Sequence, residues 1–322
     1  MTAFPLSLLL SLPLLAGSVV ALHWGIRRGL AAPRVVAEAE PEGLPFQTVR
    51  IPTKNGKQLF AWMIPAEAPN LLHCSDASGS FDSPALILMH GWGGNAASML
   101  PLAGPLHAAG YTLLLLDARC HGRSDGDTFA SLPRFAEDIE AAVSWLAGQP
   151  GIDPQRLGLV GHSVGAGAAL LAASRSPAIK AVISLAAFAH PAAMMRRWLQ
   201  WKRIPYWPFG RYILAYVQKV IGYRFDQIAP CQTIASVACP VLLVHGSEDR
   251  IVPLADAQQI YSARRSDRVE LLVVPGSHDD YGDLRQPITE LVEFLKRNMV
   301  LGHRETASHQ DAACASGVPV MP

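Results

Sequence analysis

The chain has 322 residues, of which 50% are hydrophobic and only 16% are charged, and its formal net charge is +1. Soluble domains usually carry roughly 25% charged residues, so the composition predicts one ordinary folded core with an additional apolar segment. A net charge this close to neutral gives no case for nucleic-acid binding. The five cysteines are scattered and odd in number, which excludes a small disulfide-stabilised scaffold.

The first feature along the chain is an apolar, uncharged segment from Phe4 to Trp24. Because about 20 such residues cross a bilayer as a helix, residues 1–28 are predicted to form a membrane anchor. Arg27 and Arg28 follow this segment, so the positive-inside bias puts the rest of the chain on the cytoplasmic side. Two alternatives stay open. One is a signal peptide processed near Val19-Val20-Ala21, which gives a secreted or periplasmic protein, and the other is a segment buried in the protein itself.

The rest of the chain divides into a tether over residues 29–45, a domain over residues 46–300 and a tail over residues 301–322 that we expect to be disordered. Within the domain, Lys54-Asn55-Gly56 lies between two apolar runs and predicts a hairpin turn. Strand-like runs then alternate with helical segments, which is typical of an α/β fold. Helices are expected near residues 96–109, 132–147, 165–176, 254–264 and 287–298.

A glycine-rich turn follows the buried strand predicted from Ala85 to Met89. Its sequence is His90-Gly91-Trp92-Gly93-Gly94-Asn95. Such a turn lets backbone N–H groups point at a developing oxyanion. The amide of Trp92 is therefore a candidate donor, and it needs a partner from the segment that carries the nucleophile.

That segment is Gly161-His162-Ser163-Val164-Gly165, which follows an apolar run and precedes a run of small residues. This context predicts a strand, a sharp turn and a helix, with the Ser163 hydroxyl raised at the helix N-terminus. The flanking glycines leave room for a close crossing of the strand and the helix. Ser163 is the predicted nucleophile, and the amides of Trp92 and Val164 are the predicted oxyanion donors.

A serine hydroxyl needs a base, and the next strands supply candidates. The strand predicted to end at His245 runs into Gly246-Ser247-Glu248-Asp249, and the following strand runs into Pro275-Gly276-Ser277-His278. Both loops lie beyond the carboxyl ends of their strands, where open α/β sheets place their sites. We predict His278 as the base and Asp249 as the acid that orients it.

Together these motifs resemble the α/β-hydrolase superfamily, and in particular its monoacylglycerol-lipase-like and serine-aminopeptidase-like branch. The resemblance covers about residues 46–299 and includes the run from Asp117 to Ser124. It implies an eight-stranded, mostly parallel sheet with helices on both faces, a lid inserted after the sixth strand, and hydrolysis of an acyl bond. It also favours Asp249 over Glu248, because the offset of Asp249 before Ile251-Val252-Pro253 matches that of the family.

Other polar residues near these motifs have structural interpretations. His90, His121 and His162 lie beside glycines and are expected to make loop hydrogen bonds, and Asp117 is a structural acid by the resemblance. Asp125, Glu248, Asp279 and Asp280 compete with Asp249 for the orienting role. The chemistry needs no cofactor and no metal ion, and the sequence shows no metal-ligand cluster.

The predicted lid, at about residues 190–230, is both aromatic and basic. Its aromatic residues are Trp198, Trp201, Tyr206, Trp207, Phe209, Tyr212, Tyr216, Tyr223 and Phe225. Its cations are Arg196, Arg197, Lys202, Arg203, Arg211, Lys219 and Arg224, against one acid, Asp226. A surface of this kind favours contact with anionic lipid headgroups. In the alternative interpretation the aromatic rings pack the lid onto the domain and the cations are solvated.

The sequence as a whole predicts a membrane-anchored serine hydrolase that cleaves carboxylic esters or thioesters, with a small-molecule acyl ester or a lipid as substrate. Aminopeptidase-like or other amide cleavage is the nearest enzymatic alternative, although the basic lid offers little to hold a substrate amino group. Acyl transfer to an alcohol is a further option. An alternative of another class is a non-catalytic, membrane-tethered binding protein that keeps the fold.

Overall fold

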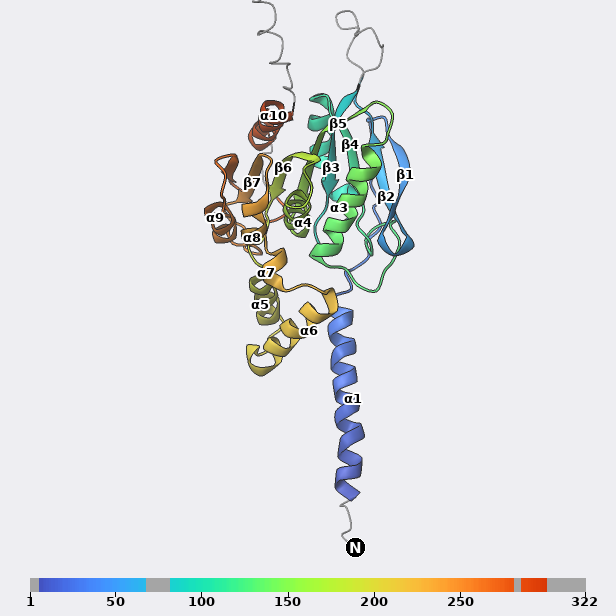
Figure 1. The fold of residues 1–322 in the computed structure, drawn as a ribbon, viewed down its shortest axis with the longest axis vertical. Coiled ribbons are helices and arrows are strands. Elements are labelled where there is room, and N and C mark those ends of the chain that lie inside the picture. The colour runs from blue at the N-terminus through green and yellow to red at the C-terminus, as the bar shows by residue number, and fades with distance from the viewer. Residues whose placement is uncertain (1–5, 68–81, 281–284, 300–322) are drawn as a thin grey trace, which may run out of the picture.

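The computed structural model describes residues 6–67, 82–280 and 285–299 (Figure 1). Its centre is an eight-stranded sheet in the order β1-β2-β4-β3-β5-β6-β7-β8. Strand β2 runs antiparallel to both of its neighbours, and the remaining pairs are parallel. The expected eight-stranded, mostly parallel sheet is therefore confirmed.

The strands alternate with helices along the chain. The strands are β1 (Gln47–Thr53), β2 (Lys57–Ile64), β3 (Ser83–Met89), β4 (Thr112–Leu116), β5 (Ile152–His162), β6 (Ile179–Leu185), β7 (Val241–Gly246) and β8 (Val269–Val274). The helices of the domain are α2 (Leu100–Ala108), which follows the 3₁₀ turn η2 (Ala96–Met99), α3 (Leu132–Leu146), α4 (Val164–Ala173), α9 (Leu254–Ser262) and α10 (Arg285–Met299). These positions agree with the expected helices to within a few residues at each end.

Apolar cores lie on both faces of the sheet. Phe135 of α3 and Leu170 of α4 belong to one core, and Leu106 of α2 and Phe294 of α10 belong to the other. Strands covered on both faces read as continuous apolar runs, and all seven residues of β3 are buried. At the sheet edge, Asn55 (φ 61°) and Gly56 (φ 65°) form the predicted hairpin turn between β1 and β2.

An insertion of helices separates β6 from β7, as expected for a lid. It contains α5 (Pro191–Trp201), the π-helical turn η3 (Tyr206–Gly210), α6 (Arg211–Ile221), α7 (Phe225–Ile228) and α8 (Pro230–Thr233). Figure 1 shows α5 and α6 below the sheet, beside the end of the N-terminal helix. Leu199, Leu214 and Val217 are buried, whereas Trp207 is 70% exposed and Phe209 is 56% exposed. Aliphatic side chains therefore pack the lid, and much of its aromatic surface faces outward.

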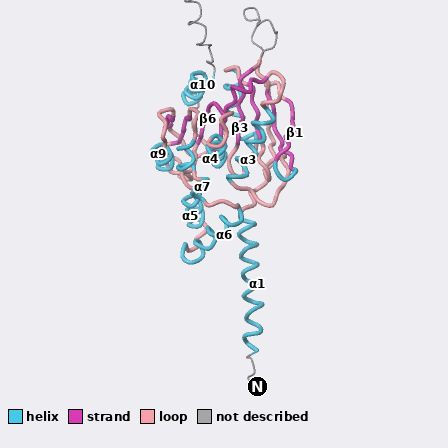
Figure 2. The backbone as a smooth tube through the Cα atoms, in the orientation of Figure 1, coloured by secondary structure: helices cyan, strands magenta, loops and turns pink. Residues whose placement is uncertain are grey.

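The N-terminal segment forms a helix, α1 (Leu6–Gly29), that projects from the body of the molecule (Figure 2). None of the helices built by the described residues has both the length and the apolar character needed to cross a membrane. The predicted membrane-spanning anchor is thus not found. The C-terminal end of α1 instead contacts the lid, where the His23 ring stacks on Tyr216 with 4.0 Å between centroids.

The expected tether and tail have different outcomes. Residues 30–37, in the segment predicted as a tether, lie against the domain: the Leu30 carbonyl accepts a hydrogen bond from the Ala130 amide at 3.1 Å, and Ala37 is buried. The predicted disordered tail, residues 301–322, lies outside the described residues.

The turn between β5 and α4 has an unusual backbone. Ser163 adopts φ 54° and ψ −117°, a combination that non-glycine residues rarely hold. A Cβ atom added to Gly161 would overlap the carbonyl of Gly165, and one added to Gly165 would overlap the carbonyl of His90. The close crossing of strand and helix therefore requires glycine at both positions, as the motif predicts.

Replacement of Gly161 by alanine is expected to lower the free energy of unfolding by at least ~2 kcal/mol, because the new methyl group meets backbone that cannot rotate away. The matched control is Gly104→Ala in α2, where a Cβ would have nothing within 4 Å. That change should be neutral or stabilising by up to about 1 kcal/mol, since alanine favours the helix. Urea denaturation of both variants measures the difference, and equal stability would contradict the packing argument.

Candidate active site

The three side chains predicted as a catalytic triad lie together at the carboxyl edge of the sheet. His278 Nε2 is 3.0 Å from Ser163 Oγ, and His278 Nδ1 is 2.7 Å from Asp249 Oδ2. Ser163 follows β5, Asp249 follows β7 and His278 follows β8. The geometry is that of a nucleophile, a base within hydrogen-bond reach and an acid that orients the base.

Asp249 is held as an ionised acid by its own loop. Its Oδ1 accepts hydrogen bonds from the amides of Ile251 at 2.9 Å and Val252 at 2.8 Å. Burial alone would raise the pKa of Asp249, but the hydrogen bond to His278 and those from the two amides outweigh burial, so its pKa is lowered. Asp249 is therefore a carboxylate at neutral pH, as an orienting acid must be.

The competing acids lie elsewhere. Glu248 is exposed beside the buried Asp249, and Asp279 and Asp280 are exposed as well. Asp125 Oδ2 accepts a hydrogen bond from the Gln58 amide at 2.8 Å, away from His278. Of the acids considered from the sequence, Asp249 is the one in contact with the His278 ring.

The turn after β3 contacts Ser163. A Cβ built on Gly91 would lie 3.2 Å from the Ser163 Cβ, so the loop backbone lies against this residue. His90 Nδ1 donates to the Gly91 carbonyl at 2.6 Å, and the Gly94 amide donates to the same carbonyl at 3.1 Å. Because a peptide plane points its C=O and its N–H in opposite directions, holding the Gly91 carbonyl also fixes the direction of the Trp92 N–H.

The Val164 amide is the first of α4, and helix N-termini leave such amides free for an anion. Both amides predicted to bind an oxyanion therefore belong to segments that adjoin Ser163.

The three histidines that the sequence places beside glycines near the site make loop hydrogen bonds, as expected. His90 Nε2 accepts from the Ala118 amide at 3.1 Å, so its proton is on Nδ1. His121 Nδ1 donates to the Arg119 carbonyl at 3.0 Å, and His162 Nε2 donates to the His278 carbonyl at 2.9 Å. Burial lowers the pKa of all three, that of His90 to about 3.

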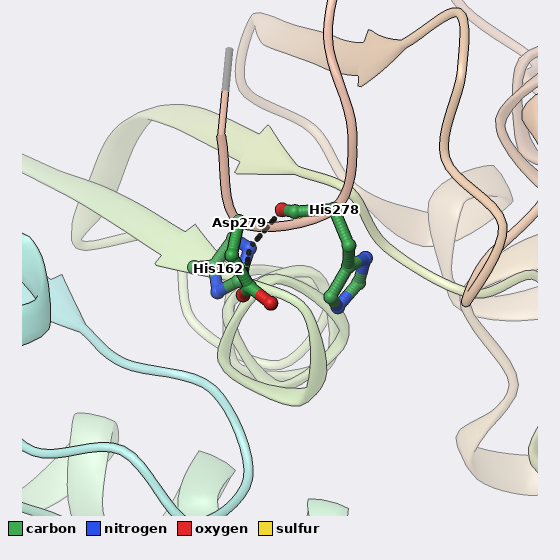
Figure 3. A group of neighbouring side chains, drawn as sticks. All are labelled: His162, His278 and Asp279. Atoms are coloured by element: carbon green, nitrogen blue, oxygen red, sulfur yellow. Dashed lines mark hydrogen bonds and ion pairs between the residues drawn. The ribbon is translucent and has the colours of Figure 1, made fainter.

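His162, His278 and Asp279 form a group that resembles a metal site in outline (Figure 3). Both ring nitrogens of His278 are already engaged with Ser163 and Asp249, and His162 Nε2 is engaged with the His278 carbonyl. Binding of an ion by His278 would have to break one of these two contacts. The group therefore fits the serine chemistry better than it fits a metal ion.

Asp117 supports the loops on one side of the site. Its Oδ1 accepts from the Ala96 amide at 2.6 Å, its Oδ2 accepts from the Arg123 amide at 2.7 Å, and burial raises its pKa. A Cβ on Gly122 would overlap the Asp117 carboxylate, so that neighbour has to be glycine. This is the structural role that the resemblance implied.

Two features near the site were not predicted from the sequence. His245 is buried beneath the acid: its Nε2 donates to the Val252 carbonyl at 2.7 Å and lies 3.5 Å from Asp249 Oδ2. Its position at the end of β7, four residues before Asp249, was a usable signal. The second feature is the contact of Pro33 and Arg34 with the loops around the site, for which the local sequence holds no signal.

An apolar cavity of about 430 Å³ borders His162. Leu185, Val244 and Leu291 line it, together with His162 and Asp279. Its lining includes Asp279, which follows His278, so apolar volume is present next to the loop that carries His278.

Comparisons with known proteins agree with this architecture. The uncharacterized protein Rv2307c of Mycobacterium tuberculosis is 31% identical over 300 residues, which cover 90% of this chain and 94% of that protein. The uncharacterized protein YfhR of Escherichia coli is 25% identical over 265 residues, covering 79% of this chain and 82% of that protein.

Among solved structures, the Pyrococcus furiosus esterase Pf2001 superposes with a TM-score of 0.65 at 23% identity, covering 83% of this chain and 99% of that one. Est1E from Butyrivibrio proteoclasticus, solved with ferulic acid bound, superposes with a TM-score of 0.59 at 21% identity, covering 79% of this chain and 100% of that one. At these identities the likeness shows the fold alone. Residues 83–220 match the family described as serine aminopeptidase, S33. The chain belongs to this family of the α/β-hydrolase superfamily.

Proposed function

We propose that this protein is a serine hydrolase that cleaves carboxylic ester or thioester bonds through an acyl-enzyme intermediate. The observation that carries the proposal is the chain of contacts from Ser163 Oγ to His278 Nε2 at 3.0 Å and from His278 Nδ1 to Asp249 Oδ2 at 2.7 Å. The buried, ionised acid and the strained turn at the serine are both features of a nucleophile activated by a base.

The steps follow from these contacts. His278 takes the Ser163 proton as the hydroxyl oxygen attacks the acyl carbonyl, and Asp249 stabilises the imidazolium that forms. The amides of Trp92 and Val164 bind the negative oxygen of the tetrahedral intermediate. His278 then protonates the leaving alcohol or thiol, and water repeats the sequence to release the acid. Transfer of the acyl group to an alcohol would use the same residues with a different acceptor.

A lipid-derived acyl group is the proposed substrate class. The support is the outer face of the lid, where Trp201, Trp207 and Phe209 are each more than half exposed. The Arg211 guanidinium lies 5.6 Å from the Trp207 ring centroid, so at least one of these exposed rings is paired with a cation. Ester substrates also agree with the structural neighbours, which are described as an esterase from Pyrococcus furiosus and Est1E with ferulic acid bound.

An aminopeptidase activity, which the family description would suggest, has less support in the lid. A peptide amino terminus needs a free carboxylate, and Asp226, the acid of the insertion, lies 2.9 Å from His190 Nε2. The remaining charges of the insertion are basic. A binding protein without catalysis would have no use for the strained Ser163 backbone or for a base within hydrogen-bond reach of it.

We also propose attachment to a membrane through the apolar N-terminal segment and the outer face of the lid, with the catalytic domain on the cytoplasmic side. The support is Arg27 and Arg28 directly after the apolar segment, together with the basic and aromatic lid. Processing near Ala21, with export of the domain, is the alternative.

Replacement of Ser163 by alanine is expected to abolish activity, with kcat reduced by roughly 10⁶-fold because the attacking oxygen is gone. The measurement uses purified protein, a fluorophosphonate probe and p-nitrophenyl esters from acetate to palmitate. Wild-type labelling and turnover that vanish in the variant support the nucleophile, and a preference for long chains supports the lipid-derived substrate. A wild-type protein that neither labels nor hydrolyses any of these esters favours the binding-protein alternative.

The assignment of the acid has its own test. Asp249→Asn should lower kcat by ~10⁴-fold, because the amide cannot hold the imidazole in the productive tautomer. The matched control is Glu248→Gln, at an exposed neighbouring site, which should leave kcat and KM near their wild-type values. A large loss of kcat in Glu248→Gln together with a small one in Asp249→Asn would reverse the assignment.

For membrane attachment, fractionation of cells that express the full chain should recover it, unprocessed, with the membranes. Mass spectrometry of the recovered protein then reports its N-terminus. An unprocessed protein found wholly in the supernatant would overturn the attachment, and a chain beginning after Ala21 outside the cytoplasm would favour the signal peptide.

A further inference from the structure

The segment that joins α1 to β1 runs along the site. We refer to residues 30–37 as the strap. Its first residue, Leu30, is held by a hydrogen bond: the Leu30 carbonyl accepts from the Ala130 amide at 3.1 Å. Its last residue, Ala37, is buried in the core that contains Phe60 and Trp62. The strap is therefore fixed at both ends, and its middle residues lie over the loops that surround Ser163.

Arg34 binds the loop that follows β4. Its Nε donates to the Gly122 carbonyl at 2.9 Å, and its Nη2 donates to the Ser124 carbonyl. The same loop wraps Asp117: the Arg123 amide donates to Asp117 Oδ2 at 2.7 Å, and Ser124 Oγ donates to the Asp117 carbonyl at 2.6 Å. The guanidinium thus holds the outer side of the loop that positions Asp117.

Asp117 also holds the turn after β3 through a hydrogen bond. Its Oδ1 accepts from the amide of Ala96, the first residue of η2. The residue before it, Asn95, caps η2 by accepting from the Ala97 amide at 3.0 Å. The C-terminal end of the turn that carries Trp92 is therefore anchored on the carboxylate that Arg34 supports through its loop.

The strap also contacts that turn directly. Gly93 has a φ of +76°, and a Cβ built on it would lie 2.9 Å from Pro33 Cγ, so the Pro33 ring lies close to this glycine. Asn95 Nδ2 donates to the Val35 carbonyl at 3.1 Å. Trp92 is the residue between Gly91, held from inside by His90, and Gly93, covered from outside by Pro33.

We propose that Pro33 and Arg34 are positioning residues for the oxyanion hole, so that the strap is part of the catalytic apparatus and not a passive spacer. This inference rests on the proposed hydrolase function. An oxyanion donor contributes only when it is aligned on the oxygen that becomes charged, and a loop free to shift by a fraction of an ångström loses much of that contribution. Such a loss appears in kcat and not in KM, because the ground-state substrate does not use the donor fully.

The N-terminal helix contributes to this arrangement from the other end. Arg27 Nε donates to the Tyr216 hydroxyl at 3.0 Å, His23 Nε2 lies 2.5 Å from the Tyr212 hydroxyl, and both tyrosines belong to α6 of the lid. Leu30 directly follows the helix that these contacts hold, and its amide bonds to the Ile26 carbonyl at 3.2 Å. The start of the strap is thereby set by α1 docked on the lid.

The test uses the full chain with Arg34→Met, Arg34→Lys and Pro33→Ala, beside Arg265→Met as an exposed surface control. Fluorophosphonate labelling to completion counts the active sites, so kcat is expressed per competent site and misfolded protein does not enter it. The other readouts are KM for a p-nitrophenyl ester, the inhibition constant of a trifluoromethyl ketone, whose adduct carries an oxyanion, and the pH profile of kcat/KM.

Arg34→Met should lower kcat per site by roughly tenfold or more, leave KM unchanged and weaken the trifluoromethyl ketone by the same factor. Arg34→Lys should recover part of the loss, since an ammonium reaches one of the two carbonyls. Pro33→Ala, a smaller change, should act in the same direction. The pH profile should keep its wild-type shape because the triad is untouched, and Arg265→Met should match the wild type in every readout.

Three outcomes overturn the inference. If wild type turns over esters while the Arg34 and Pro33 variants keep the wild-type kcat per site and change only in thermal stability, the strap is structural and the proposed function stands. A rise in KM at constant kcat would likewise place the strap in substrate binding instead. If wild type shows neither labelling nor turnover, the proposed function fails, and the inference fails with it.

Discussion

The backbone turn at Ser163 is the constraint on which the rest of the site depends. Its φ of 54° and ψ of −117° cost strain of order 1–3 kcal/mol, which surrounding structure must offset. Two hydrogen bonds help to hold the turn: the Ser163 amide donates to the Leu185 carbonyl of β6 at 2.8 Å, and the Ser163 carbonyl accepts from the Gly167 amide at 3.1 Å. Ser163 is therefore fixed by the sheet and α4 and not by a loop, and the other site residues have one rigid reference point.

The sheet also positions Asp249 and His278 beside Ser163. Asp249 and His278 follow β7 and β8, which pair in parallel from Val241↔Val269 to Gly246↔Val274, so both loops leave the sheet at the same edge. A Cβ on Gly246 would lie 2.5 Å from the Gly276 carbonyl, which shows how closely the two loops cross. His245 holds the Val252 carbonyl, so the segment whose amides bind Asp249 is itself fastened to the end of β7.

The features of the fold and the site that could be predicted from the sequence are those that depend on a local residue pattern. Buried parallel strands give continuous apolar runs such as 85–89, and the turn at Asn55-Gly56 has a residue requirement that few other sequences satisfy. The Gly161 and Gly165 contacts have the same character, because a backbone clash dictates the residue type. The order of Ser163, Asp249 and His278 along successive strands then brings the three side chains together through the topology of the sheet.

What could not be predicted depends on pairs far apart in the chain with no periodic signal. Arg34 binds carbonyl oxygens at 122 and 124, and any residue can offer a carbonyl, so nothing in the local sequence marks them as partners. The same holds for the stacking of His23 on Tyr216. The apolar character of the N-terminal segment predicted a membrane-crossing helix, whereas the docking of its C-terminal end on α6 depends on aromatic and hydroxyl contacts that hydropathy does not report.

The charge state of the histidines around Ser163 affects the protonation of His278. Burial lowers the pKa of His90, His121 and His162 from an ordinary value of about 6.5, so these rings are neutral near pH 7. The His162 ring centroid lies 5.0 Å from that of His278, and at an effective dielectric constant of about 20 two charged rings at this separation would repel by about 3 kcal/mol. A protonated His162 would therefore oppose the imidazolium that the proposed mechanism forms on His278. A neutral His162 keeps one N–H, which it donates to the His278 carbonyl. The ring therefore holds the His278 backbone without opposing the protonation of the His278 ring.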